Sequence, residues 1–402
     1  MPFPSWLSST CVSSDTTVTI SKTRNNVSSS DTSTASEIPS TSSSSSLPSN
    51  FSLQTFPSLP SLQKASSAEQ PSSSSSTPTP LLHHLCLSSI RPHHPCHVST
   101  LALSNSLLYV ASSNQVSVWN LKTLSKITSF NGNGKGSVKS VAFSNGKVFT
   151  AHQDSKIRVW EVTDSKRRHH RLVTSLPTVS DRLRRFIFPA NYVRVRRHRK
   201  RLWIEHADAV SSLAVSNGVI YSVSWDRSLK IWSASDLLCI ESVDSAHDDA
   251  VNAVAVSGDG TVYTGSADRR IRVWGRAFGG KRQTLIATLE KHKSSVNALA
   301  LNSGGSILYS GAKDRSILVW EREDSANYMV VMGVLRGHGG AILCLINEGD
   351  LLFSGSADRT VRIWRRGSGD GYDCLGVLEG HERPVKSLGA AWEGGERVVC
   401  AM

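Results

Sequence analysis

The chain has 402 residues and a formal net charge of +13, and it holds no run near the ~18 apolar residues that cross a bilayer. The charge is local: residues 166–201 carry 13 Lys or Arg and one acid, Asp181, and the rest of the chain is close to neutral. The seven cysteines are scattered, odd in number and without a C-x-x-C pair, so we expect a reducing compartment, the cytoplasm or the nucleus.

The Ser-rich start of the chain is predicted to be a disordered tail. Residues 1–80 contain 28 serines and almost no apolar periodicity, so this segment cannot bury enough apolar surface to become ordered. It also has no long apolar core, which argues against a secretory signal or a membrane anchor. Phosphorylation would suit so many serines, but composition names no site.

A ten-residue sequence recurs in the remainder of the chain. "GSADRRIRVW" (265–274) and "GSADRTVRIW" (355–364) are near copies, and looser copies end at Trp160, Trp232 and Trp320. In all five copies an Asp stands six residues before the Trp. Neighbouring Trp residues, including Trp119, lie 41 to 46 residues apart except for one interval of 72, which contains the basic cluster. The period identifies a repeat protein.

Each repeat has the pattern of short strands. "VNALAL" (296–301), "TVYTGS" (261–266) and "RIRVW" (270–274) are rich in β-branched residues, alternate with period two and are bounded by turn residues. Four strands in 40–45 residues are typical of the blade of a β-propeller. We therefore predict an all-β propeller over residues 81–402, with a basic insertion at 166–205 between the second and third blades.

With these motifs the chain resembles the WD40-repeat proteins. A His stands 20–22 residues before the Asp of four repeats, and a Ser or Thr stands four residues before it. The resemblance implies seven blades and a buried hydrogen-bonded tetrad in each of these four. The tetrads would be His206, Ser222, Asp226 and Trp232; His247, Thr264, Asp268 and Trp274; His292, Ser310, Asp314 and Trp320; and His338, Ser354, Asp358 and Trp364.

The first two repeats and the last depart from this pattern. The second repeat has Gly134 at the His position, and the first retains at most His94 and Asn114. No repeat Trp is followed by the Asp of the family's name. The seventh repeat begins at His381 but reaches Met402 before its third strand, so we expect a truncated last blade, closed by a strand near residues 81–90 and less stable than a complete one.

The chain is also similar, more narrowly, to plant WD-repeat proteins of the Jingubang type. The match rests on "VFTAHQDSKIRVWEV" (148–162), "SLPT" (175–178), "NYVRVRR" (191–197) and "HADAVSSLAVSNGVIYSVSWDRSLKIW" (206–232). This resemblance implies a plant regulatory role with transcription-factor or signalling partners, in pollen- or hormone-linked development.

No catalytic, cofactor or metal site is expected. A Ser, His and Asp that recur four times without a G-x-S-x-G elbow are typical of a structural network rather than a hydrolase. "NGNGKG" (131–136) lacks the G-K-[ST] of a phosphate loop. "HHLCLSSIRPHHPCHV" (83–98) is rich in His and Cys, but its spacing matches no zinc module.

The expected partners are proteins, bound on the face where the His loops and the Asp turns open. Trp225 lies just before a turn Asp and either binds a partner or packs under the insertion, which we expect on the same face. Gln153, Ala267, Lys313 and Ala357 hold equivalent positions. Within the insertion, residues 179–188 should form a helix with Leu183, Phe186 and Ile187 packed inward.

The basic residues at the end of the insertion admit several interpretations. "YVRVRR" and "RLWIE" should form a cationic hairpin with Trp203 near its end. Its cations are Arg194, Arg196, Arg197, Arg199, Lys200 and Arg201. They suit a solvated basic loop without a partner, a nuclear import signal, an acidic segment of a protein partner, or nucleic-acid phosphates.

We therefore predict a non-enzymatic interaction scaffold without a membrane or small-molecule ligand. The alternatives are a nucleic-acid-associated protein and a ubiquitin-ligase substrate receptor, the latter disfavoured because no W-D-x-R signal or F-box pattern occurs.

Overall fold

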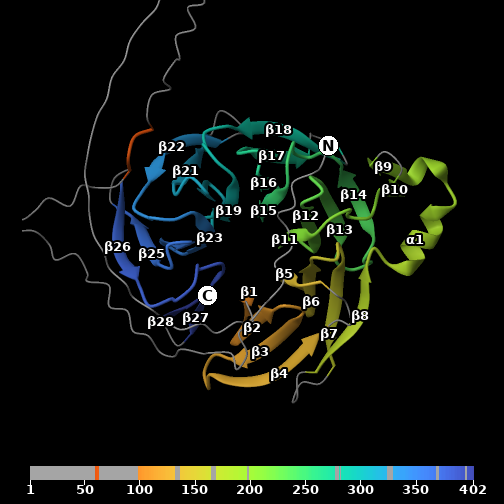
Figure 1. Ribbon diagram of the computed structural model, residues 1–402, viewed down its shortest axis with the longest axis horizontal. Coiled ribbons are helices and arrows are strands. Elements are labelled where there is room, and N and C mark those ends of the chain that lie inside the picture. The colour runs from red at the N-terminus through yellow and green to blue at the C-terminus, as the bar shows by residue number, and fades with distance from the viewer. Residues whose placement is uncertain are drawn as a thin grey trace, which may run out of the picture. The chain divides into compact units, whose positions relative to one another are not determined.

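Antiparallel sheets follow one another along the chain in the computed structural model (Figure 1). The structure describes residues 59–62, 98–131, 136–163, 169–196, 199–276, 280, 282–323, 329–367, 371–393 and 396–402. The Ser-rich tail and the His- and Cys-rich segment at 83–97 lie outside these residues, apart from residues 59–62.

Six sheets have four strands each, in chain order from the inner to the outer strand. We call them blades one to six. Blades one to three comprise β1 (Val98–Ser104), β2 (Leu107–Ser112), β3 (Gln115–Asn120) and β4 (Ser125–Asn131); β5 (Val138–Ser144), β6 (Lys147–His152), β7 (Ile157–Val162) and β8 (His170–Leu176); and β11 (Val210–Ser216), β12 (Val219–Ser224), β13 (Leu229–Ser233) and β14 (Cys239–Val243).

Blades four to six continue the series with the same topology. They comprise β15 (Val251–Val256), β16 (Val262–Ser266), β17 (Ile271–Arg276) and β18 (Gln283–Leu289); β19 (Val296–Leu301), β20 (Ile307–Ala312), β21 (Ile317–Arg322) and β22 (Met329–Leu335); and β23 (Ile342–Glu348), β24 (Leu351–Ser356), β25 (Val361–Arg366) and β26 (Tyr372–Leu378). The strands predicted from alternation are confirmed.

The last blade is shorter than the others in the described part of the chain. We expected seven blades with the last one truncated; six sheets have four strands each, and the chain then forms a two-stranded sheet, β27 (Leu388–Glu393) with β28 (Glu396–Ala401). This small sheet lies between β23 and β1 and contacts both. The Leu101 amide of β1 donates to Ser387 Oγ at 2.8 Å, which closes the ring (Figure 1). The closing strand expected near residues 81–90 lies outside the described part of the chain.

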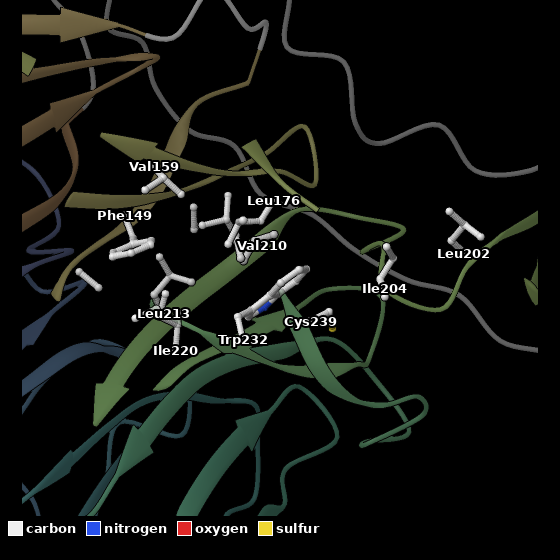
Figure 2. Close-up of a cluster of buried hydrophobic side chains, with 14 residues drawn as sticks. Phe149, Val159, Leu176, Leu202, Ile204, Val210, Leu213, Ile220, Trp232 and Cys239 are labelled. Carbon is white, nitrogen blue, oxygen red and sulfur yellow. The ribbon is translucent and has the colours of Figure 1, made fainter. Parts of the chain in front are cut away.

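The core consists of apolar clusters between neighbouring blades. Figure 2 shows the cluster between blades two and three, where Phe149 and Val159 lie near Val210 and Trp232. Because each inner strand contacts the inner strands on both sides, every blade depends on its neighbours for burial.

The basic insertion connects β8 to β11 and folds as a small unit of its own. It comprises α1 (Val179–Phe186), a 3-10 turn η1 (Pro189–Asn191), and the antiparallel pair β9 (Tyr192–Arg196) and β10 (Arg199–Leu202). The predicted helix and cationic hairpin are confirmed. In Figure 1 the insertion lies at the outer edge of the ring, beside β8 and β14.

Candidate functional site

Four blades contain the same chain of side-chain hydrogen bonds. In blade six, His338 Nδ1 lies 2.8 Å from Asp358 Oδ2, and His338 Nε2 lies 2.8 Å from Ser354 Oγ. The Trp364 indole N–H donates to the same Ser354 Oγ at 2.8 Å. This hydrogen-bond network connects the loop before the blade, which carries the His, to the second strand, the turn and the third strand of the same blade.

Blades three, four and five repeat this arrangement. The His Nδ1 to Asp distances are 3.3, 2.9 and 3.1 Å, and the His Nε2 to hydroxyl distances are 2.8, 2.7 and 2.8 Å. The indole N–H reaches the hydroxyl at 2.9, 2.9 and 2.8 Å. The residues brought together are His206, Ser222, Asp226 and Trp232; His247, Thr264, Asp268 and Trp274; and His292, Ser310, Asp314 and Trp320.

The electrostatics favour a neutral imidazole beside an ionised carboxylate. Burial lowers the pKa of His206 and of His338 below the ordinary value of 6.5. Burial alone would raise the pKa of Asp268, but hydrogen bonds from His247 and from the Arg270 amide outweigh it and lower the pKa to about 2. The neutral ring donates from Nδ1 to the carboxylate and accepts the hydroxyl proton at Nε2, so every member is satisfied.

This connectivity resembles that of a hydrolytic triad, but the hydroxyl groups are inaccessible. Ser222, Thr264, Ser310 and Ser354 are fully buried, and each oxygen already accepts an indole N–H. A nucleophile must reach a carbonyl carbon outside its own network, which these oxygens cannot do. The four networks therefore serve the fold.

Blade two builds a similar network from a different histidine. The His152 ring, on β6 two residues before Asp154, lies 2.8 Å from Thr150 Oγ1 and 3.2 Å from the Gly136 carbonyl. The Trp160 indole donates to Thr150 Oγ1 at 2.9 Å. Gly134, the position where the spacing calls for a His, lies outside the described residues. We missed His152 because the motif places the imidazole in a loop; the signal was a His where other repeats have Ser or Ala.

The turns of these blades also carry a set of exposed arginines that we did not predict. Each follows the turn Asp directly and has a positive φ of 68–73°. They are Arg227, Arg269, Arg315 and Arg359. The equivalent turns are related by the ring, so the four guanidinium groups give one face of the propeller a recurring positive charge.

The residues predicted just before each turn Asp are accessible to different degrees. Gln153 and Lys313 are exposed, whereas Ala267 and Ala357 are half-buried. Trp225 is 40% exposed, and the Lys139 ammonium of the neighbouring blade lies 5.3 Å from its ring. Burial and the nearby Lys386 charge lower the pKa of Lys139. Trp225 and Lys139 thus form an aromatic and cationic pair on this face.

The polar side of α1 is held against the residues that follow the hairpin. Asp181 is buried and accepts from Arg185 Nε at 2.7 Å, and Arg182 forms an ion pair of 2.5 Å with Glu205. The Arg185 guanidinium lies 4.5 Å from the Trp203 ring centroid. Trp203, predicted as a partner contact, is half-buried by these neighbours.

The apolar side of α1 therefore faces solvent, which corrects our prediction. Leu183, Phe186 and Ile187 are 59%, 54% and 68% exposed, and Val179 and Phe188 are exposed as well. We expected the first three to pack inward because apolar residues at this spacing normally do. The Arg182–Glu205 ion pair and the contact of Arg185 with the Trp203 ring hold the helix in the opposite orientation.

The cations of the hairpin have different environments. Arg194 and Lys200 are exposed, whereas Arg201 is half-buried and donates to the His206 carbonyl at 2.7 Å. The side chains of Arg196 and Arg199, and the whole of Arg197, lie outside the described residues. Arg201 thus holds the loop that carries His206, a structural task that its sequence context does not reveal.

Within the described ranges, no three His, Cys, Asp or Glu side chains gather as metal ligands. The His- and Cys-rich segment at 83–97 is not among those ranges. No described helix has the length and apolarity that crossing a bilayer requires.

Comparison with known proteins gives the family. The model of the "WD domain, G-beta repeat" family matches residues 124–161, 198–233, 239–275, 283–321 and 329–365. The chain is 26% identical to the mouse (Mus musculus) kinesin-like protein KIF21B over a region that covers 54% of the chain but only 12% of KIF21B. It is 25% identical to Autophagy-related protein 16 of Arabidopsis thaliana over 42% of the chain and 36% of that protein.

A third relative, the probable cytosolic iron-sulfur protein assembly protein 1 of Eremothecium gossypii, is 31% identical over 25% of the chain and 32% of that protein. The chain thus spans about a third or less of the length of these relatives. Together with the six four-stranded blades, the five repeat matches identify the chain as a WD40-repeat β-propeller protein.

Proposed function

We propose that the protein is a non-enzymatic scaffold that binds an acidic protein partner through the basic insertion. The observation that carries this proposal is the exposed apolar side of α1, formed by Leu183, Phe186 and Ile187. Monomeric proteins rarely leave such a contiguous apolar surface exposed unless it serves in binding. WD40 propellers typically act as interaction platforms, and a platform needs a surface of this kind.

Charge defines the chemistry of the partner. The insertion holds 13 cations and one acid within residues 166–201, and that acid is paired with Arg185. A partner with an apolar groove and an acidic rim would bury the α1 side chains and neutralise the surrounding arginines. The exposed arginines that follow the turn Asp residues also favour an acidic partner, on the face of the propeller where these turns open.

The biological setting is also part of the proposal. The similarity to Jingubang-type proteins supports a plant regulatory role with transcription-factor or signalling partners, in the cytoplasm or nucleus. The basic hairpin would then serve as an import signal as well as a binding element.

The test is a comparison of two variants of the full chain as bait in quantitative affinity capture. The first replaces Leu183, Phe186 and Ile187 with Ser, and the matched control replaces Leu285 and Ile286, which are exposed on β18. Partial burial of three apolar side chains contributes about 3 kcal/mol, so we expect the affinity of a purified partner to fall about 100-fold for the first variant only. A partner lost equally from both variants, or from neither, would refute the use of α1.

The nucleic-acid alternative is tested on the same protein. Binding to duplex DNA and RNA is measured over a salt series, with Arg194, Arg196, Arg197, Arg199 and Lys200 changed to Gln and Arg201 kept because it holds the His206 loop. Phosphate contacts would give a slope of about −0.9 per phosphate in log affinity against log salt on B-DNA. We expect weak binding that the changes do not affect; tight binding that they abolish would overturn the proposal.

A further inference from the structure

The outer edge of blade five carries a short segment from the N-terminal region of the chain. Residues 59–62, Leu-Pro-Ser-Leu, lie parallel to β22, with Ser61 paired to Val334. The Val334 amide donates to the Pro60 carbonyl at 3.1 Å, and the Leu62 amide donates to the Val334 carbonyl at 3.2 Å. The segment thus extends the blade by one short strand. The neighbouring sheet edge is otherwise an exposed row of backbone groups.

The two leucines anchor the segment in separate parts of the core. Leu59 packs on the cluster shared by blades four and five, which includes Met329. Leu62 packs on the cluster shared by blades five and six, beside Ile307 and Tyr372. The Tyr372 amide of blade six donates to the Leu62 carbonyl at 2.7 Å. The four residues therefore lie along the outer edge of blade five and reach blade six.

The groove is shaped for this occupant by a glycine. A β-carbon at Gly333 would lie 2.6 Å from Leu62 Cγ and 2.7 Å from the Pro60 carbonyl oxygen, so no other residue leaves room for the segment. Gly376 holds the equivalent place on β26, opposite the residue before the blade Trp, and a β-carbon there would meet nothing within 4 Å. Among the described residues the two glycines make a matched pair, one with an occupant and one without.

We propose that this groove is a peptide-binding site whose ligand is an extended Leu-Pro-x-Leu sequence, and that residues 59–62 occupy it in cis. Backbone pairing with an edge strand gives such sites affinity, and pockets for alternate or spaced side chains give them specificity. Pro60 suits the role because an edge position does not require its missing N–H. The site is separate from the α1 surface and does not depend on it.

The test uses the full chain and a fluorescein-labelled peptide with the sequence of residues 55–64, TFPSLPSLQK. The changes Leu59→Asp and Leu62→Asp remove both anchors of the segment, so the segment should leave the groove. We expect the labelled peptide to bind this variant, the vacated chain, saturably, as measured by fluorescence anisotropy. A tethered ligand acts at an effective concentration on the order of 1 mM, so it weakens binding of the free peptide by the ratio of that concentration to the Kd; for a Kd of about 0.1 mM, the unmodified chain should bind the peptide about 10-fold more weakly. The peptide with both leucines changed to Asp should not bind.

The glycine pair provides the control. Adding Gly333→Val to the vacated chain should weaken peptide binding at least about 10-fold, whereas Gly376→Val should leave it unchanged. Equal effects of the two changes, no saturable binding to the vacated chain, or equal binding to the unmodified chain would overturn the proposal.

A second measurement does not depend on how well Gly333→Val folds. In hydrogen exchange, the Leu59→Asp and Leu62→Asp chain should lose protection at the Val334 and Tyr372 amides, which donate to the segment, while β24 stays protected. Unchanged protection at both amides would also refute occupancy in cis.

Discussion

The network of blade two makes a quantitative prediction about stability and pH. We expect His152→Ala to lower the free energy of unfolding at pH 7 by about 3 kcal/mol. The buried imidazole is hydrogen-bonded to Thr150 Oγ1 and to the Gly136 carbonyl. Its removal leaves both groups without these bonds, at about 1–3 kcal/mol for each unsatisfied group, and creates a cavity.

The loss of unfolding free energy caused by His152→Ala should also depend on pH, because His152 titrates. Burial, and then the Arg158 charge, lower the pKa of His152 from 6.5 to about 4. Between these values the unfolded chain binds a proton that the folded chain does not, so the contribution of His152 is complete above pH 6.5 and declines as the pH falls toward 4. The difference of 2.5 units corresponds to about 3 kcal/mol. The gap between His152→Ala and the unmodified chain should therefore shrink to less than about 1 kcal/mol at pH 4.5.

The assay is urea unfolding of the full chain at pH 7 and pH 4.5, followed by Trp fluorescence. Ser356, two residues before Asp358, occupies the place of His152 in blade six and has no titratable group, so Ser356→Ala is the control. Its cost should be the same at both pH values, since the other histidines are common to both variants. A His152→Ala cost that does not change with pH, or that is below about 1 kcal/mol at pH 7, would refute the reasoning.

Three further predictions concern closure, acid stability and the insertion. Ser387→Ala removes the acceptor of the Leu101 amide and should lower the free energy of unfolding by about 1–3 kcal/mol, measured by urea unfolding against Ser235→Ala, an exposed site. Asp268→Asn should remove part of the loss of stability that the unmodified chain shows near pH 2. The lowered pKa makes the Asp268 carboxylate stabilising above pH 3.8, and this contribution is lost as the pH falls through 2. Acid titration of unfolding checks this, with Asp236→Asn as the control. Asp181→Ala removes the acceptor that holds Arg185 beside the Trp203 ring, so it should speed proteolysis within residues 182–201 without moving the global unfolding midpoint; equal cleavage rates would contradict this role of Asp181.

The strands were predictable from the sequence because their signal is local. Period-two alternation and turn residues recur at every repeat, and inner strands such as Val251–Val256 and Val296–Leu301 appear where the pattern places them. The orientation of α1 was not predictable in this way. Its amphipathic pattern is real, but the choice of which side faces the propeller depends on Glu205 and Trp203, which follow it by about twenty residues and are brought to it only by the hairpin.

The segment at residues 59–62 escaped prediction for a different reason. Averaged over residues 1–80, the composition is that of a chain without a core, and a four-residue motif does not change that average. Its binding depends on Gly333 and on an open strand edge, both distant in the sequence. Composition therefore predicts whether a segment folds alone, but not whether it binds a folded neighbour.

Residues at equivalent positions of the blades show which side chains the propeller fold requires and which it only tolerates. The turn after each Asp needs a residue of positive φ, which glycine adopts freely and which costs an L-residue about 1–2 kcal/mol. Arginine nevertheless occupies this position in four blades, with its side chain exposed. Trp225 likewise replaces the Gln, Ala or Lys of the other turns, and α1 exposes three large apolar side chains, Leu183, Phe186 and Ile187, on one short helix. Because folding explains none of these choices, the cationic turns, Trp225 and α1 are where a binding partner should be sought.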